Sequence, residues 1–109
     1  MTVKLQTATE REILRPLWKV HILHHASESP VIGNWLMEEL REHGYRVSPG
    51  TLYPLLRRMV RLGWLRQAPQ GRYRLTGEGR RVLAEVRARL RELQREVFPR
   101  EGRSKRAHD

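Results

Sequence analysis

The amino-acid sequence predicts a mainly α-helical fold that contains one short two-stranded hairpin. Apolar residues recur at helical spacing in four separate segments. Residues 64–75 instead resemble two short strands around a Pro-Gln-Gly turn. The last helical segment is about twenty residues long, and its apolar residues are spaced alternately by three and four, the repeat of a coiled coil. A chain of 109 residues forms one small domain with a modest core.

The first two helices are predicted over residues 9–26 and 31–43. Thr9 and Glu12 form a capping box at the first start. Pro16 should kink this helix or split off a short leading turn. Gly44 follows the last periodic residue of the second helix and is a natural helix stop. The residues of the second helix that are expected to face the core are Ile32, Trp35, Leu36 and Leu40.

The third helix is predicted over residues 48–62, with Ser48 as its cap and Pro49 at its first position. Thr76 caps a fourth helix that extends to about Phe98. The third helix is expected to bury Leu52, Leu55, Leu56 and Met59. The chain is thus expected to divide into a body (9–76), a C-terminal helix (77–98) and a mobile basic tail (99–109).

Positive charge is concentrated in one third of the chain. The formal net charge is +10, and the segment from Arg46 to Arg81 carries +8 of it, from nine arginines and one acid, Glu78. A basic surface without a partner would explain a high total charge but not this clustering. Clustering of like charge on a small fold favours binding to a polyanion.

Several other function classes are disfavoured. The chain has no cysteine, which removes disulfides and thiolate chemistry. No nucleophile with a base, phosphate loop or paired carboxylates stands out, so neither an enzyme nor a cofactor is expected. The first twenty residues contain no continuous hydrophobic stretch. We therefore expect a cytoplasmic protein without a signal peptide or membrane span.

Two helices joined by a tight turn and followed by a basic hairpin are the order of elements in a winged helix-turn-helix fold. The second helix of such a pair enters the major groove of DNA, and the hairpin, or wing, lies along the neighbouring backbone. Tyr53 could donate to a phosphate, or it could be a half-buried aromatic packed on the core. The residues expected to lie at the DNA are Ser48, Gly50, Thr51, Tyr53, Arg57, Arg61, Arg66, Arg72 and Arg74.

The C-terminal helix carries a heptad seam, defined as Leu83, Val86, Leu90, Leu93 and Val97. The helix could pack on its own domain, but a fold of this size offers little core to cover its full length. We therefore expect a homodimer. A two-fold dimer places two recognition helices in successive major grooves and requires a roughly palindromic site.

The stretch SPGTLYPLLRRM, residues 48–59, resembles the signature of the PadR family of transcriptional regulators. Residues 71–79, GRYRLTGEG, resemble the second wing strand of that family running into its last helix, and 63–65 match the opening of the wing. The resemblance covers residues 10 to 98 and is closest to the short form with one dimerisation helix. Two departures are the short wing loop and Asn34-Trp35, which replaces a tyrosine-containing sequence next to Gly33.

The resemblance implies a repressor that dimerises through its C-terminal and N-terminal helices and releases DNA when a small molecule binds. Carried over by motif, Thr51 and Tyr53 would contact DNA, and Gly50 would permit close approach.

Two further groups of residues have competing interpretations. His21 and His25 could share a helix face and chelate a metal, with His24 beside them. Polar positions on an amphipathic helix are the favoured interpretation, so no metal site is expected. Trp18 and Trp35 could line an effector pocket near the dimer interface, but a core position is favoured for each.

Two functions from other classes remain as alternatives. A sequence-tolerant nucleoid or RNA-binding protein is disfavoured, since single-strand binders usually display stacking aromatics. A winged helix that binds only proteins is disfavoured by the arginine cluster.

Overall fold

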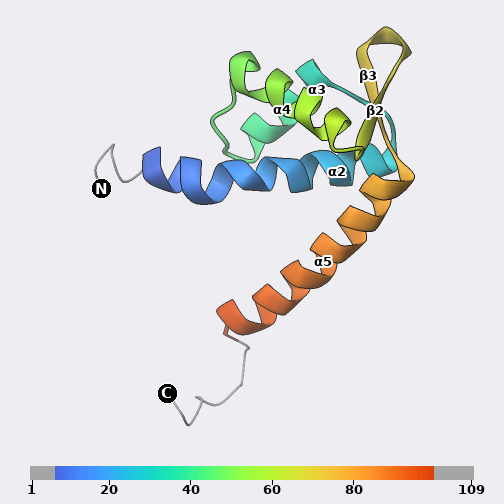
Figure 1. Cartoon of the computed structure of the whole chain (residues 1–109). Coiled ribbons are helices and arrows are strands. Elements are labelled where there is room, and N and C mark those ends of the chain that lie inside the picture. Colours follow the sequence, from blue (N-terminus) through green and yellow to red (C-terminus); the bar gives the residue numbers. More distant parts are fainter. Residues whose placement is uncertain (1–6, 100–109) are drawn as a thin grey trace.

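The computed structural model describes residues 7–99 as a helical body with a small sheet, from which one long helix extends (Figure 1). The elements in chain order are a π-helical turn (Glu10–Leu14), a 3-10 turn (Arg15–Leu17), α2 (Trp18–Glu28), β1 (Val31–Ile32), α3 (Gly33–Glu42), α4 (Pro49–Arg61), β2 (Leu65–Ala68), a 3-10 turn (Pro69–Gly71), β3 (Arg72–Leu75) and α5 (Gly77–Val97). No helix among the described residues is long and apolar enough to cross a membrane.

The N-terminal helix is interrupted at Pro16, as predicted. The π-helical and 3-10 turns precede a regular α2 that begins at Trp18. A proline within a helix lacks a donor and crowds the preceding turn, which explains the change of helical pitch. The predicted start is wrong, because residues 7–9 are already helical and Thr9 itself has helical backbone angles.

The second helix begins two residues later than predicted. Val31 and Ile32 form β1, which pairs with β3 through Tyr73 and Arg72, so the sheet has three strands rather than two. Two β-branched residues favour a strand wherever a partner strand is available. Gly44, with a φ of +94°, ends the segment as expected.

The three strands lie in the antiparallel order β1-β3-β2. In the wing hairpin Leu65 lies opposite Leu75, and Arg66 lies opposite Arg74. On β3 the buried Tyr73 and Leu75 alternate with the exposed Arg72 and Arg74, and Leu65 is the buried residue of β2. This alternation fixes the register and directs the wing arginines away from the core.

One hydrophobic core unites the body. Its fully buried side chains come from α2, α3, α4, β2 and the first half of α5; they are Trp18, Ile22, Leu23, Leu36, Leu40, Leu52, Leu56, Met59, Leu65 and Leu83. Leu55, predicted to be buried, is only half-buried. Thr76 caps α5 as predicted, because its hydroxyl accepts a hydrogen bond from the Gly79 amide at 2.9 Å. The C-terminal part of α5 points away from the body (Figure 1). Residues 100–109 of the predicted tail lie outside the described residues.

Candidate nucleic-acid interface

The helix-turn-helix pair is α3 and α4, joined by residues 43–48. Backbone hydrogen bonds hold this link at its first residues, including Tyr45 N–H to the Leu40 carbonyl at 3.1 Å. The Arg41 guanidinium donates from Nη2 to the Val47 carbonyl at 3.0 Å, six residues further on. Hydrogen bonds therefore hold the turn at both ends. They fix the angle between α3 and α4 within the single chain.

The recognition helix α4 has two contrasting faces. Leu52, Leu56 and Met59 are buried in the core. The exposed positions include Gly50, Arg57 and Arg61, together with Pro54. Small and basic residues on the outer face allow both close approach and hydrogen bonding to a polyanion. Gly50, Arg57 and Arg61 are therefore exposed on α4, and their contact with DNA stays a prediction.

The start of α4 differs from the prediction in one respect. Ser48 precedes the helix with extended backbone angles, but its side chain makes no capping hydrogen bond. Its hydroxyl instead lies 3.2 Å from the hydroxyl of Thr51. The helix begins at Pro49, whose missing amide hydrogen needs no cap. Two neighbouring hydroxyls at a helix N-terminus are thereby left at the surface, where a phosphate can be bound.

Tyr53 combines the two interpretations drawn from the sequence. Its ring packs over Gly33, where an added Cβ would lie 2.5 Å from the ring. Its hydroxyl donates to Oδ1 of Asn34 at 3.3 Å and is exposed at that end. Gly33 is therefore needed for the close contact between α3 and α4. Asn34 belongs to this surface and was noted in the sequence only as a departure in local packing.

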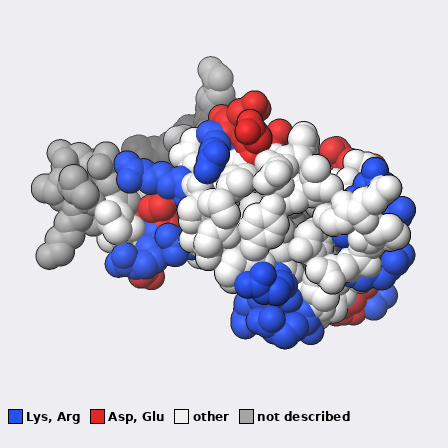
Figure 2. All heavy atoms as spheres, turned by 90° about the horizontal axis from the view of Figure 1, so that it is seen from above, with Lys and Arg blue, Asp and Glu red and all other residues white. Residues whose placement is uncertain are grey.

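The wing presents three arginines on its exposed side. Arg66 and Arg74 are cross-strand partners, and Arg72 lies two residues from Arg74 on the same strand. Gln70 and Gly71 both have positive φ, which makes the hairpin tip short. Figure 2 views the molecule from above: basic side chains form several groups around an uncharged central area, and acidic side chains gather at the edge opposite the largest basic group.

A basic hollow of about 460 Å³ lies between α4 and the N-terminal helical segment. Arg58 and Arg61 line it from α4, beside Thr51. The opposite wall carries three further basic residues, which are Arg11, Arg15 and Lys19. Sequence reasoning missed these three, although their spacing of four places them on one helix face. The positive surface thus extends beyond the segment in which arginines cluster.

The predicted seam on α5 is only partly exposed. Leu83 is 2% exposed and belongs to the core of its own protomer, so the expectation that it faces a partner is corrected. Val86 is half-buried, and the exposed fractions of Leu90, Leu93 and Val97 are 38%, 52% and 57%. The apolar stripe that remains uncovered therefore begins near Val86 and continues to the end of the helix.

The two candidate pocket tryptophans lie in different surroundings. Trp18 is fully buried, which confirms the core interpretation. Trp35 is 44% exposed, and the core interpretation is wrong for it. Trp35 lines a hollow of about 560 Å³ together with Ile32, Gln70 and Arg72, whereas Trp18 borders the basic hollow. The structure therefore does not bring the two together in one pocket. Ile32, also expected in the core, is 42% exposed.

Comparison with known proteins identifies the family. Residues 22–85 match the transcriptional regulator PadR-like family, over more than half of the chain. The chain is 50% identical over 95 residues to the transcriptional regulator Rv3488 of Mycobacterium tuberculosis, which covers 81% of this chain and 89% of that protein.

Solved structures agree with this result. The crystal structure of a PadR-like transcription factor from Bacteroides fragilis superposes with a TM-score of 0.67 at 28% identity, over 82% of this chain and 94% of the other. The structure of TA0346 from Thermoplasma acidophilum, with a TM-score of 0.63 and 24% identity over 78% and 90% of the chains, shares the fold. The chain belongs to the PadR-like family of transcriptional regulators, which are DNA-binding proteins and not enzymes.

Proposed function

We propose that the protein is a homodimeric cytoplasmic repressor that binds a palindromic operator and releases it when a small molecule binds. One observation carries the specific-binding part of this proposal. The outer face of α4 offers Gly50, Arg57 and Arg61 opposite a fully buried face, next to a wing with three exposed arginines. In this arrangement α4 enters the major groove while the wing follows the backbone.

The roles of individual residues follow from their positions. Gly50 lets the helix backbone approach the DNA. Arg57 can form two hydrogen bonds with a guanine edge, and Arg61 is placed for a phosphate. The hydroxyls of Thr51 and Tyr53 stand on opposite flanks of α4. Thr51 is a further donor, and Tyr53 becomes one when its hydroxyl turns from Asn34 to a phosphate. Ser48 adds a hydroxyl beside Thr51, and Arg66, Arg72 and Arg74 neutralise phosphates along the wing.

The dimer is formed in this proposal by the uncovered stripe of α5, from Val86 to Val97. Uncovered valines and leucines spaced by three and four along a helix that leaves its own body require a covering partner. An isologous contact between two copies closes the assembly. The two recognition helices then fit half-sites about one helical turn, roughly 34 Å, apart.

The effector site that we propose is the hollow beside Trp35. It combines an exposed indole face with the polar groups of Glu28 and Arg72 and lies between α3 and the wing. A bound molecule there changes the position of the wing relative to α3. The Trp18 side chain is fully buried, so it does not contact the effector in this proposal and belongs to the core.

Fluorescence tests the effector site. A compound that releases operator DNA is expected to quench Trp35, and the Trp35→Ala variant is expected to bind the operator but to resist release. A compound that releases this variant as effectively as the unchanged protein would place the effector elsewhere.

The operator proposal is tested by fluorescence anisotropy. DNA from upstream of the protein's own gene and a scrambled duplex are compared across a salt series. As the salt concentration rises, the protein is expected to lose the scrambled duplex first and to keep binding the operator duplex. Arg57→Ala is expected to weaken operator binding about tenfold or more, since a bidentate contact contributes about 1–3 kcal/mol.

Arg91→Ala is the matched control, because it removes the same charge from an exposed position on α5. This control is expected to change operator affinity less than about twofold, as a distant surface charge does. Equal losses in the two variants would show that only the total charge matters. That result, or equal binding to both duplexes, would contradict sequence-specific recognition through α4.

A further inference from the structure

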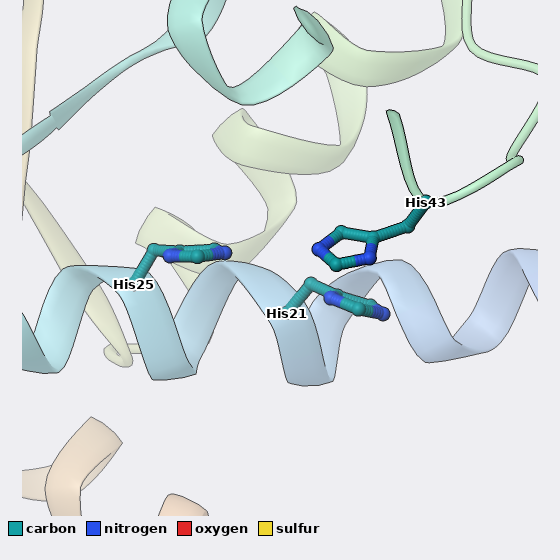
Figure 3. A group of neighbouring side chains, drawn as sticks. All are labelled: His21, His25 and His43. Carbon is teal, nitrogen blue, oxygen red and sulfur yellow. The ribbon is translucent and has the colours of Figure 1, made fainter. Parts of the chain in front are cut away.

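Four metal-binding side chains gather on the side of α2 that faces α3. His21 and His25 lie one turn apart on α2, and His43 follows the end of α3 (Figure 3). Glu39 comes from α3. The proposed DNA contacts and the effector hollow leave this cluster largely unused, with only His25 at the edge of the hollow. The sequence showed the pair on α2 but could not show that two further ligands lie opposite it.

The distances within the cluster suit a single ion. Ligand nitrogens of His21, His25 and His43 all lie within 4.8 Å of one another. Oε2 of Glu39 lies 3.7 Å from Nε2 of His25 and 3.4 Å from Nε2 of His43. Ligands of a tetrahedral zinc ion are about 3.4 Å apart, given zinc–nitrogen distances of about 2.0–2.1 Å. Small rotations of the rings therefore complete the geometry.

The chemistry of the four groups also suits a transition metal. Imidazole nitrogens and one carboxylate oxygen are ligands that zinc accepts in tetrahedral sites. Burial lowers the pKa of His21, and the neighbouring His43 lowers it further. Burial likewise lowers the pKa of His25, against the raising effect of Glu39. Metal ions bind the neutral form of imidazole.

Neighbouring side chains hold two of the rings in place. The Tyr45 hydroxyl lies 2.9 Å from Nε2 of His21 and can accept a hydrogen bond from that ring. The indole of Trp35 stands edge-on to His25, with ring centroids 5.0 Å apart. Metal-ligating histidines commonly use the second ring nitrogen for a hydrogen bond that fixes their orientation. The surroundings therefore resemble those of a prepared metal site more than those of a solvated histidine patch.

We propose that His21, His25, Glu39 and His43 bind one divalent cation of the zinc class, which ties α2 to the C-terminal end of α3. This site replaces the expectation from the sequence that no metal binds. A bound ion fixes the first helix of the helix-turn-helix pair against the body of the domain. It does so at the start of the turn that leads into α4.

A neighbouring group, His24, His25 and Glu28, competes for the same ion through His25. It comes from α2 alone, and the Arg87 guanidinium lies 3.2 Å from Nδ1 of His24. A fixed positive charge at that distance opposes a second cation. The cluster between two helices is therefore the better site.

Isothermal titration with Zn²⁺ and absorption spectroscopy with Co²⁺ test the site on the full chain, tag-free and stripped of metal. We expect one ion per protomer, a dissociation constant of about 1 μM or lower, and the visible Co²⁺ bands of tetrahedral coordination. Saturating Zn²⁺ is expected to raise the Tm by about 10 °C at a hundredfold excess over the dissociation constant.

The decisive variants are His43→Ala and Glu39→Gln, with His24→Ala as the matched control. His43 is half exposed, so its removal leaves the core intact. Loss of an outer-shell partner costs about 10–100-fold in affinity, so loss of a direct ligand is expected to exceed about 100-fold. The control is expected to bind Zn²⁺ as the unchanged protein does. Unchanged affinity in both decisive variants, or a loss confined to His24→Ala, would overturn the proposed site.

Discussion

Leu90→Asp is expected to convert the proposed homodimer into a monomer and to weaken operator binding by about 100-fold or more. Leu90 lies in the middle of the uncovered stripe of α5 and is 38% exposed in the single chain. In a two-fold interface each substitution occurs twice, so two carboxylates would be buried in one apolar contact. A buried carboxylate without a partner is strongly unfavourable. The loss in affinity follows because two linked half-site contacts gain about 10²–10⁴ over one.

Ala88→Asp is the matched control for this experiment. It adds the same charge to an exposed position of the same helix, two residues away and on the side opposite the stripe. Light scattering is expected to show a dimer for this control and a monomer for Leu90→Asp. A dimer that survives Leu90→Asp, or is lost equally in Ala88→Asp, would show that the stripe of α5 is not the interface.

Local patterns in the sequence predicted the main helical segments and the wing hairpin, although not β1 or the start of the first helix. The glycine at position 44 and the cap at Thr76 act over a few residues, and the structure confirms both. The outer face of α4 was predictable for the same reason. The helical repeat of its apolar residues shows which residues face the core and which face outward.

The features that the sequence did not reveal depend on contacts between distant segments. Val31 and Ile32 are too short to be recognised as a strand, and they become one because β3 offers an edge some forty residues later in the chain. Trp35 was predicted to be a core residue because it belongs to the same helical pattern of apolar residues as Leu36 and Leu40. It is exposed because it lies at the flank of the buried stripe, about 100° around the helix from Leu36, and faces the hollow beside the wing.

The same reason applies to the candidate sites. The metal cluster joins α2 to residues about twenty positions further on, and the basic hollow joins the N-terminal turns to α4. Neither juxtaposition has a local signal. His21 and His25, like Arg11, Arg15 and Lys19, have a spacing of four on a helix, but a single helix face does not indicate what packs against it.

Gly79→Ala is expected to lower the free energy of unfolding by about 2–3 kcal/mol, a large effect for a single methyl group. A Cβ at this position would collide with the carbonyl oxygen of Trp64 and would lie 2.7 Å from Cδ1 of Leu75. The first contact is with backbone, which has no rotamer to change. The clash therefore requires the start of α5 to move away from the wing.

That movement is opposed by the hydrogen bonds around Thr76. Its amide donates to the Trp64 carbonyl at 3.0 Å, and its hydroxyl donates to the Gly63 carbonyl while accepting from the Gly79 amide. Displacing α5 breaks this arrangement and also disturbs Leu83, the residue of α5 that completes the core. The higher helix propensity of alanine, about 1 kcal/mol, offsets part of the loss but not all of it.

Gly77→Ala separates the clash from the general effect of replacing a glycine. Gly77 lies two residues earlier in the same helix turn, has no positive φ, and no atom lies within 4 Å of its would-be Cβ. This control is expected to be as stable as the unchanged protein or up to about 1 kcal/mol more stable. Urea unfolding at one fixed protein concentration compares the two, because dimer stability depends on concentration. Equal stabilities would mean that α5 joins the wing loosely. The direction of α5, which would set the spacing of the two recognition helices in the proposed dimer, would then not depend on this contact.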